Sequence, residues 1–272
     1  LEKNKDLKVT ARDTGSVFYK RVYSRLTPAE KAAWDKNLDQ REKEYEKQKP
    51  KSRDFIRWKY QIYMRDYLSC IRSLDDNIGR LHDYLEKSGL AENTIFIYSS
   101  DQGFYLGEHG WFDKRFMYDE SYRTPLLVKW PGVTKPGSVS EKLVSNLDFA
   151  QTFLEIAGTD ADSEMQGMSL VPLLKGQEPE QWRKYHYYHY YEYPGVHRVR
   201  RHEGVTTGRY KLIRFYGVDV PNGEEWELYD LERDKLELRN EYSNPEYVKI
   251  VAKLKKELQN LRKKYEVIEI PQ

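Results

Sequence analysis

The sequence predicts an α/β fold, and three features of the chain point to it. Apolar residues at helical spacing over residues 53–87 predict a long helix, which a short turn joins to a β-branched apolar run over residues 94–98. That run, a polar loop and a second apolar run over residues 125–130 predict strand, loop and strand. A long helix that leads through a short turn into a strand is half of a βαβ unit. Farther along, short aromatic runs predict an antiparallel sheet.

The helices near the start of the chain have clear end signals. Thr27, Pro28 and Glu30 form a helix start, and we expect that helix to end near Gln48, before Pro50. The long helix ends at a glycine, and its apolar face carries Tyr63, Tyr67, Cys70, Ile71, Leu74, Ile78, Leu81 and Leu85. We expect Cys70, the single cysteine, to be buried on this face for packing. One cysteine excludes an intrachain disulfide and a cysteine-rich zinc site.

A change in amino-acid composition in the second half of the chain suggests a domain boundary. After a predicted helix over residues 146–157, residues 159–183 are rich in glycine, proline and acidic residues. We therefore predict a main α/β domain over residues 1–176 and a smaller domain over residues 177–272. The smaller domain is expected to hold strands over residues 185–193, 204–215 and 225–231. A final helix over residues 245–264 is expected to bury Val248, Val251, Leu254, Leu258 and Leu261.

Composition narrows the classes of protein. The 272 residues carry a net charge of +2, which argues against a nucleic-acid-binding protein. No apolar run approaches the roughly 18 residues that a membrane span needs. The first residue is Leu1 rather than Met, so we expect a trimmed N-terminus, and the lack of a signal peptide says nothing about compartment. The 23 tyrosines and 6 tryptophans suit either a carbohydrate-binding surface or a tyrosine-rich sheet.

Oxygen donors follow the first predicted strand. Asp101 and Gln102 supply a carboxylate and an amide oxygen, and Gly103 permits a sharp turn. Hard cations such as Ca²⁺ and Mg²⁺ prefer oxygen ligands, and ligands of open α/β sheets lie beyond the carboxyl ends of strands. Two ligands do not complete a site, and a capping aspartate in a tight turn is the alternative.

One lysine in the same loop is a candidate for anion binding. Lys114 lies thirteen residues after Asp101, and an ammonium beside a metal ion can hold the oxygens of a tetrahedral anion. The alternative is a surface lysine. Asp113 and Arg115 flank it and either contact sugar hydroxyl groups or pair with each other.

The histidines allow several interpretations. His109 is either an acid–base group or a loop histidine bonded to backbone. His186, His189, His197 and His202 lie in one aromatic segment, but no HExxH-like spacing indicates zinc. We favour a polar, aromatic wall beside a substrate over a metal site, and ordinary sheet surface over both for most of these residues.

The motifs taken together resemble those of sulfatases in the alkaline-phosphatase superfamily. The matching segments are SDQGFYLGEHG at residues 100–110, LDDNIGR at 74–80, DKR at 113–115, TPLLV at 124–128 and NLDFAQT at 146–152. The resemblance covers residues 55–176 well and the rest more loosely. Within the family, Tyr191-Glu192-Tyr193-Pro194 and the segment from His197 to Thr207 resemble bacterial N-acetylglucosamine-6-sulfatases or mucin-desulfating sulfatases.

The resemblance implies a fold and a set of roles. The fold is the C-terminal part of an alkaline-phosphatase-like mixed sheet flanked by helices, followed by a small α+β subdomain with an antiparallel sheet. Asp101 and Gln102 correspond to Ca²⁺ ligands, with Mg²⁺ as an alternative, although many sulfatases have Asn or His after the aspartate. Lys114 corresponds to the residue that holds the sulfate. Asp113, Arg115 and His197 are the candidates for sugar recognition.

The largest departure from the family is the missing nucleophile. Sulfatases use a formylglycine made from a Cys/Ser-x-Pro/Ala-x-Arg motif, and the segment from Cys70 to Leu74 does not match it. The family's first metal-binding aspartates also lie upstream, and residues 1–54 contain no histidine. The sequence is therefore expected to be the C-terminal half of a sulfatase, with an N-terminal half of the same fold as its partner. Alone, it is expected to bury its core poorly.

The resemblance also implies an activity. The expected reaction is hydrolysis of a sulfate ester on a glycan amino sugar, namely N-acetylglucosamine 6-O-sulfate of host glycosaminoglycan or mucin. A phosphodiesterase or phosphonate hydrolase of the same superfamily and a non-catalytic glycan-binding module are the alternatives. By analogy with related enzymes, the compartment is the periplasm or the outside of the cell.

Overall fold

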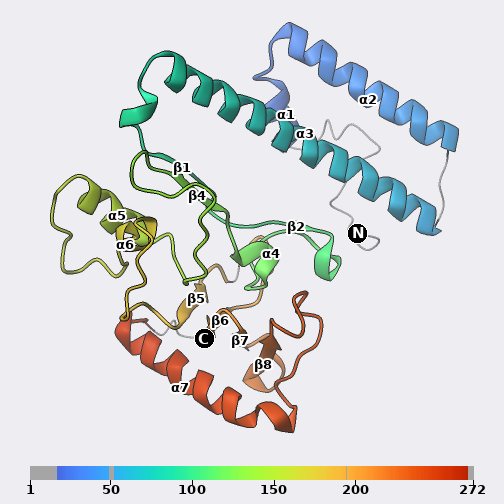
Figure 1. The fold of residues 1–272 in the computed structure, drawn as a ribbon. Helices are drawn as coiled ribbons and strands as arrows, with labels where there is room; N and C mark the ends of the chain where they lie inside the picture. Colours follow the sequence, from blue (N-terminus) through green and yellow to red (C-terminus); the bar gives the residue numbers. More distant parts are fainter. Residues whose placement is uncertain (1–16, 49–51, 194, 269–272) are drawn as a thin grey trace. The chain divides into compact units, whose positions relative to one another are not determined.

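The computed structural model describes residues 17–48, 52–193 and 195–268 (Figure 1). These residues divide into two compact units. The first unit runs to Tyr84 and includes Leu106–Phe112, and the second comprises Leu85–Tyr105 and the chain from Asp113 onward. Pro50 and Pro194 lie outside the described residues. The boundary predicted near residue 176 stays a prediction.

The first unit is helical. It contains α1 (Val17–Tyr23), α2 (Pro28–Gln48), most of α3 (Ser52–Lys87) and η2 (Glu108–Gly110). The predicted start of α2 is confirmed, because the Thr27 amide donates to Glu30 Oε2 at 2.7 Å and the Glu30 amide donates to Thr27 Oγ1 at 3.3 Å. An ion pair of 2.7 Å between Arg41 and Asp66 joins α2 to α3.

The apolar face of α3 is only partly covered. Ile62 is buried, whereas Leu68, Ile71, Leu74 and Leu81 are each 43–53% exposed. Cys70 is also exposed, so its expected burial is wrong. The physical reason is that helical periodicity identifies an apolar face but does not determine how far that face is covered.

The second unit begins with a two-stranded sheet. After η1 (Ala91–Asn93), β1 (Phe96–Ser99) pairs antiparallel with β4 (Leu126–Lys129). This confirms the predicted strand, loop and strand. The intervening loop contains the short elements β2 (Tyr105–Leu106), β3 (Phe112–Asp113) and α4 (Asp119–Tyr122). The helix predicted over residues 146–157 is present as α5 (Asp148–Ile156), and α6 (Val171–Leu174) follows it.

A four-stranded antiparallel sheet follows in chain order. Its strands are β5 (His186–Tyr190), β6 (His202–Thr206), β7 (Tyr210–Tyr216) and β8 (Glu224–Asp230), and η3 (Pro221–Gly223) precedes the last. The single strand predicted over residues 204–215 is wrong. The chain reverses there because Gly208 has a φ of +88° and Thr207 Oγ1 accepts a hydrogen bond from the Tyr210 amide at 2.9 Å.

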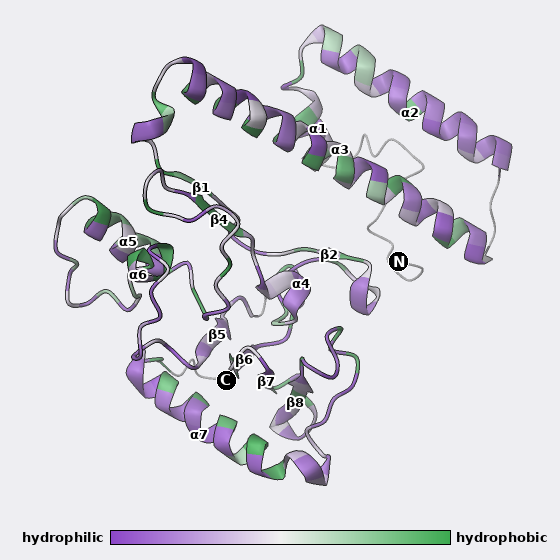
Figure 2. Ribbon diagram, in the orientation of Figure 1, coloured by the Kyte–Doolittle hydropathy of each residue, from purple (hydrophilic) through white to green (hydrophobic). Residues whose placement is uncertain are grey.

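Hydrophobic clusters cover both faces of this sheet. On one face η4 (Pro245–Tyr247) and α7 (Val248–Lys264) pack, with hydrophobic and hydrophilic residues alternating along α7 (Figure 2). This cluster contains Val205, Leu212, Leu228, Tyr247, Leu254, Leu258 and Leu261. Val248 is 61% exposed, so its expected burial is wrong. The reason is its place at the first turn of α7, ahead of the buried stripe.

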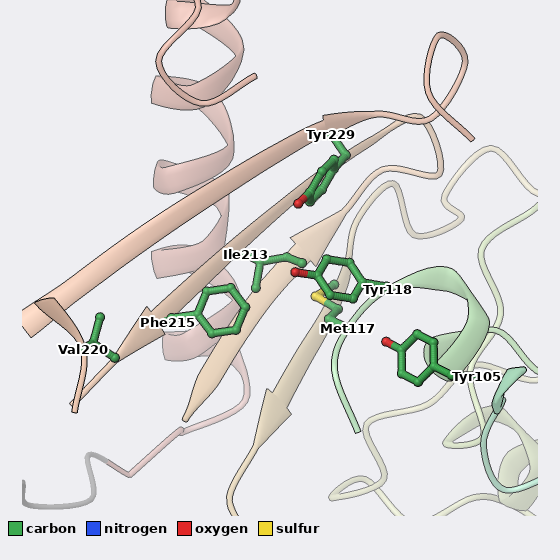
Figure 3. Close-up of a cluster of buried hydrophobic side chains, with 7 residues drawn as sticks. All are labelled: Tyr105, Met117, Tyr118, Ile213, Phe215, Val220 and Tyr229. Carbon is green, nitrogen blue, oxygen red and sulfur yellow. The ribbon is translucent and has the colours of Figure 1, made fainter. Parts of the chain in front are cut away.

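The second cluster joins the sheet to the loop that carries the candidate site. It is built from Tyr105, Met117, Tyr118, Ile213, Phe215, Val220 and Tyr229 (Figure 3). Met117 is completely buried against the sheet. The loop between β1 and β4 is therefore fixed to the sheet by apolar burial. Among the described residues no helix is long and apolar enough to cross a membrane.

Candidate active site

The loop that follows β1 carries the two candidate metal ligands and is pressed against α4. The Gly103 amide donates to the Ser121 carbonyl at 2.8 Å. A Cβ atom at Gly103 would lie only 2.1 Å from the Glu120 carbonyl oxygen, so this approach requires glycine. Asp101 Oδ1 accepts the Gln102 amide at 3.0 Å, and the carboxylate is exposed. Asp101 therefore does cap the turn, as the alternative interpretation expected. Its other carboxylate oxygen, Oδ2, has no hydrogen-bond partner among the described residues.

The donor set fits part of a hard-cation site. An exposed carboxylate oxygen and a half-buried amide side chain are donors of the kind that Ca²⁺ and Mg²⁺ take. Two side chains are too few for a complete coordination sphere. Among the described residues, no three His, Cys, Asp or Glu side chains are grouped for metal binding.

The backbone on both sides of Lys114 is strained. Asp113 has a φ of +86° and Arg115 a φ of +104°, a region that residues other than glycine rarely occupy. The Arg115 amide donates to Ser121 Oγ at 2.7 Å, and the Arg115 carbonyl accepts the Tyr188 hydroxyl at 2.5 Å. These bonds hold a conformation that a free loop would avoid, and strain of this kind is concentrated at functional sites.

The candidates for sugar recognition form one polar cluster. Arg115 forms a short ion pair with Asp113, and its Nε lies 3.8 Å from Glu192 Oε2. Glu192 accepts from the Tyr190 hydroxyl at 2.7 Å and lies 2.9 Å from His197 Nδ1. The structure thus brings His197 close to Asp113 and Arg115, although His197 lies more than eighty residues after both in the sequence.

Glu192 connects this cluster and was not among the predicted site residues. Hydrogen bonds from Tyr190 and His197 lower the pKa of the Glu192 carboxyl, while burial and the bond to Glu192 raise the pKa of Tyr190. The only sequence signal was its place in the Tyr-Glu-Tyr segment near His197. Its contacts depend on tertiary structure.

Aromatic side chains support the cluster from within the sheet. The His202 ring is completely buried and stacks on Phe116, Tyr188 and Tyr190, with ring centroids 5.2–5.5 Å apart. Burial lowers the pKa of His202 to about 4, so the ring is neutral at pH 7. His202 is part of the layer beneath Arg115 and Tyr190.

The other histidines of this segment have structural partners. His186 forms a short hydrogen bond with Tyr122, and burial lowers its pKa to about 4. His189 Nε2 lies 2.7 Å from the Tyr216 hydroxyl. Only His197 is exposed, so the four histidines do not form a common wall. His109 lies in the first unit with a φ of +54° and stays an untested candidate.

A buried ion network holds α4 in place. The loop of Asp101 and Gln102 and the loop of Lys114 both contact this helix. Lys211 is completely buried, and its Nζ lies 2.5 Å from Asp119 Oδ1 and 2.8 Å from Glu237 Oε1. Glu237 Oε2 accepts the Asp119 amide at 2.6 Å. Burial raises the pKa of Glu237 to about 6 despite Lys211. The network ties the start of α4 to the four-stranded sheet.

Fold and site together define a class of protein. In this class an α/β chain carries a lysine and oxygen donors in the loop after a strand, and these groups suit the binding of a tetrahedral anion and a hard cation. The family model for sulfatases matches residues 24–159, and that for the C-terminal region of N-sulphoglucosamine sulphohydrolase matches residues 107–264. The chain belongs to the sulfatase family, as the motifs predicted.

Curated relatives carry related names. An N-acetylglucosamine-6-O-sulfatase of Bacteroides thetaiotaomicron is 47% identical over 267 residues, which is 96% of this chain and 47% of that protein. Human N-acetylglucosamine-6-sulfatase is 42% identical over 113 residues, which is 41% of this chain and 20% of that protein. The chain thus spans about half the length, or less, of these relatives.

Solved structures confirm the predicted fold class. A structure described as a complex with its substrate D-glucosamine-2-N,6-O-disulfate matches with a TM-score of 0.87 and 47% identity, over 96% of this chain and 53% of that one. Phosphonate monoester hydrolase of Agrobacterium radiobacter matches with a TM-score of 0.67 and 25% identity, over 76% of this chain and 42% of that one.

Proposed function

We propose that the protein containing this chain hydrolyses a sulfate ester on a glycan amino sugar, namely the 6-O-sulfate of N-acetylglucosamine or a related glucosamine. The observation that carries the proposal is the match over 96% of the chain, at 47% identity, to a protein named as an N-acetylglucosamine-6-O-sulfatase. The match to a structure that holds a 6-O-sulfated glucosamine supports the same substrate class. Host glycosaminoglycan or mucin is the proposed source of the sugar.

Each predicted site residue has a role in this proposal. Lys114 binds the sulfuryl oxygens, and its strained flanking residues hold it in place before substrate arrives. Asp101 and Gln102 hold Ca²⁺, or Mg²⁺, which supplies positive charge beside the sulfate when bound. Asp113, Arg115 and His197 bind sugar hydroxyl groups, with Glu192 joining Arg115 to His197.

The proposal includes a second half of the same fold. A formylglycine nucleophile and the remaining metal ligands are expected there, because the segment from Cys70 to Leu74 does not match the formylglycine motif. Support comes from the relatives, of which this chain covers about half. In the second unit, Leu127 is 64% exposed and Phe153 is 50% exposed, and these apolar surfaces are available to such a half.

Replacing Lys114 with Ala tests the catalytic proposal. In the longer enzyme we expect kcat on N-acetylglucosamine 6-O-sulfate to fall on the order of 10²–10³-fold, because a preorganised positive charge is lost. Lys142, which pairs with Glu178 at 3.2 Å on the surface, is the control, and Lys142→Ala should keep wild-type kcat. Wild-type turnover by Lys114→Ala would exclude the proposed role.

Two alternatives are separated by the choice of substrate. The structural match to a phosphonate monoester hydrolase favours an assay that compares sulfate and phosphonate esters of one alcohol. A preference for the sulfate ester supports the proposal, and a preference for the phosphonate ester contradicts it. Tight binding of the sulfated sugar with no turnover by the longer protein would indicate a glycan-binding module.

We also propose that the enzyme acts in the periplasm or outside the cell. The support is analogy with related sulfatases, which are exported enzymes. Cell fractionation followed by detection of the protein tests this, and a cytoplasmic location would contradict it.

A further inference from the structure

We propose that Ser121 is a positioning residue that sets the loop of Lys114 relative to the loop of the candidate metal ligands. The inference rests on the proposed function. Ser121 is 5% exposed and bonds to both loops. Its Oγ accepts the Arg115 amide at 2.7 Å, and its carbonyl accepts the Gly103 amide at 2.8 Å. Gly103 directly follows Gln102, and Arg115 directly follows Lys114.

The bond from the Arg115 amide to Ser121 Oγ is made where the backbone conformation is strained. Arg115 has a φ of +104°, and the bond from its amide to Ser121 Oγ acts on one side of this strained residue. The Tyr188 hydroxyl holds the carbonyl on the other side at 2.5 Å. Without Ser121 Oγ, the amide loses its acceptor and the strain favours relaxation of the Lys114 backbone.

Hydrogen bonds to the rest of the second unit hold Ser121 in place. Its amide donates to the Tyr118 carbonyl at 2.9 Å, within the turn that begins α4. Asp119, in the same turn, is bonded to Lys211 and Glu237, which are buried in the second unit. Ser121 is thus attached to a fixed part of the fold, and both loops take their positions from it.

The hydroxyl of Ser121 bonds to the Arg115 amide and also to the Tyr105 side chain, whereas its carbonyl holds Gly103, and this division makes the proposal testable. A side-chain substitution removes the bonds to Arg115 and Tyr105 and leaves the carbonyl that holds Gly103. Ser121→Ala should therefore impair Lys114 without impairing the metal ligands. A general loss of folding would impair both.

The experiment compares Ser121→Ala, Ser121→Thr and Thr152→Ala in the longer enzyme. Thr152 is the matched control, since the residue is 2% exposed and its hydroxyl accepts the Leu170 amide at 2.8 Å, a bond of the same kind within the α5 and α6 region. Ser121→Ala should lower kcat on the order of 10–100-fold with Ca²⁺ affinity, measured by calorimetry, unchanged. Ser121→Thr keeps the hydroxyl and should restore kcat. Thr152→Ala should keep wild-type kcat even if its melting temperature falls.

Hydrogen–deuterium exchange supplies a readout that needs no substrate. The peptide containing Arg115 should exchange faster in Ser121→Ala and at the wild-type rate in Thr152→Ala. If Ser121→Ala fails to fold, Ser121→Cys, with a sulfur that accepts weakly, should show intermediate kcat and exchange. Wild-type kcat and exchange in Ser121→Ala, or equal loss of kcat in Thr152→Ala, overturn the proposal. If the unaltered enzyme hydrolyses no sulfate ester, the proposed function fails, and the exchange measurement still decides whether Ser121 holds the loop.

Discussion

Arg115 is the residue at which the contacts of the candidate site meet. Its guanidinium pairs with Asp113 and approaches Glu192, while its amide and carbonyl are held by Ser121 and Tyr188. Side chain and backbone are therefore both constrained. A site that binds a charged sugar gains from such constraint, because less ordering remains to be done when the ligand arrives.

At this scale, Glu192→Gln tests how the polar cluster is held together. The substitution keeps the size of the side chain and removes the negative charge that joins Tyr190, His197 and Arg115. We expect KM for N-acetylglucosamine 6-O-sulfate to rise on the order of 10-fold, with kcat changed little, because the proposal assigns the cluster to sugar binding and Lys114 to sulfate binding.

A matched control lies on β8. Glu225 pairs with Arg200 at 3.1 Å and is 45% exposed, as is the Glu192 side chain. Glu225→Gln should leave KM unchanged. An equal rise in both variants would mean that general surface charge, and not the cluster, sets KM.

At the scale of elements, α4 is the support for the site although it has only four residues. The loop after β1 packs against it through Gly103, and the loop of Lys114 is bonded to it through Ser121. Helices this short are not stable alone, so its position depends on the Lys211 network and on the cluster around Met117. The site is therefore only as rigid as the sheet behind it.

Gly103→Ala tests the packing on α4 of the loop that carries the candidate metal ligands. The new Cβ would approach the Glu120 carbonyl to 2.1 Å, so the loop must move. We expect a loss of stability of about 1–3 kcal/mol and weaker Ca²⁺ binding by the longer enzyme, by about 10-fold. Gly79, on α3, has open space around its Cβ position, and Gly79→Ala should keep both stability and calcium affinity. Unchanged calcium affinity in Gly103→Ala would show that the loop does not bind the metal.

At the scale of the molecule, buried titratable groups link stability to pH. His202 and His186 have pKa values of about 4, below the 6.5 of an unfolded histidine. Their contribution is complete above pH 6.5 and is lost as the pH falls toward 4, because the unfolded chain takes up protons first. Glu237, with a pKa raised from 4.5 to about 6, acts in the opposite direction and stabilises the fold as the pH falls through this range.

The expected result is a lower melting temperature at pH 5 than at pH 7. Each histidine contributes a loss of about 2 kcal/mol at pH 5, and Glu237 offsets about 1 kcal/mol. His202→Gln, which keeps a polar side chain near the Arg200 carbonyl, should reduce the difference in stability between pH 7 and pH 5 by about 2 kcal/mol. The same pH dependence in wild type and variant would contradict the assignment to His202.

The exposed apolar residues of α3 lead to a prediction about how cooperatively the chain unfolds. Leu68, Ile71, Leu74 and Leu81 of α3 leave an exposed apolar stripe, and we expect the 272-residue chain alone to melt without a sharp, cooperative transition. Co-expression with the proposed second half should produce a cooperative transition. A cooperative transition of the chain alone would contradict the expectation that it buries its core poorly.

The sequence by itself determined the class of fold, the family and the elements with local signals. The capping residues of α2, the periodicity of α3 and α7, and the apolar runs of β1 and β4 are local patterns, so a single segment reveals them. The turn at Thr207 and Gly208 was missed because the flanking residues read as one continuous strand. The exposure of Cys70 was missed because periodicity identifies an apolar face but not what covers it.

Only the tertiary structure decided which site residues meet. Asp113 and Arg115 lie close in sequence, but their proximity to His197 requires the four-stranded sheet to bring Glu192 beside Arg115. Ser121 gave no chemical signal, because its role consists of bonds to the backbone amides of Gly103 and Arg115, and the sequence does not show which acceptors those amides find. Local sequence sets the conformation that each segment prefers, whereas the packing of the sheet sets which segments share hydrogen bonds.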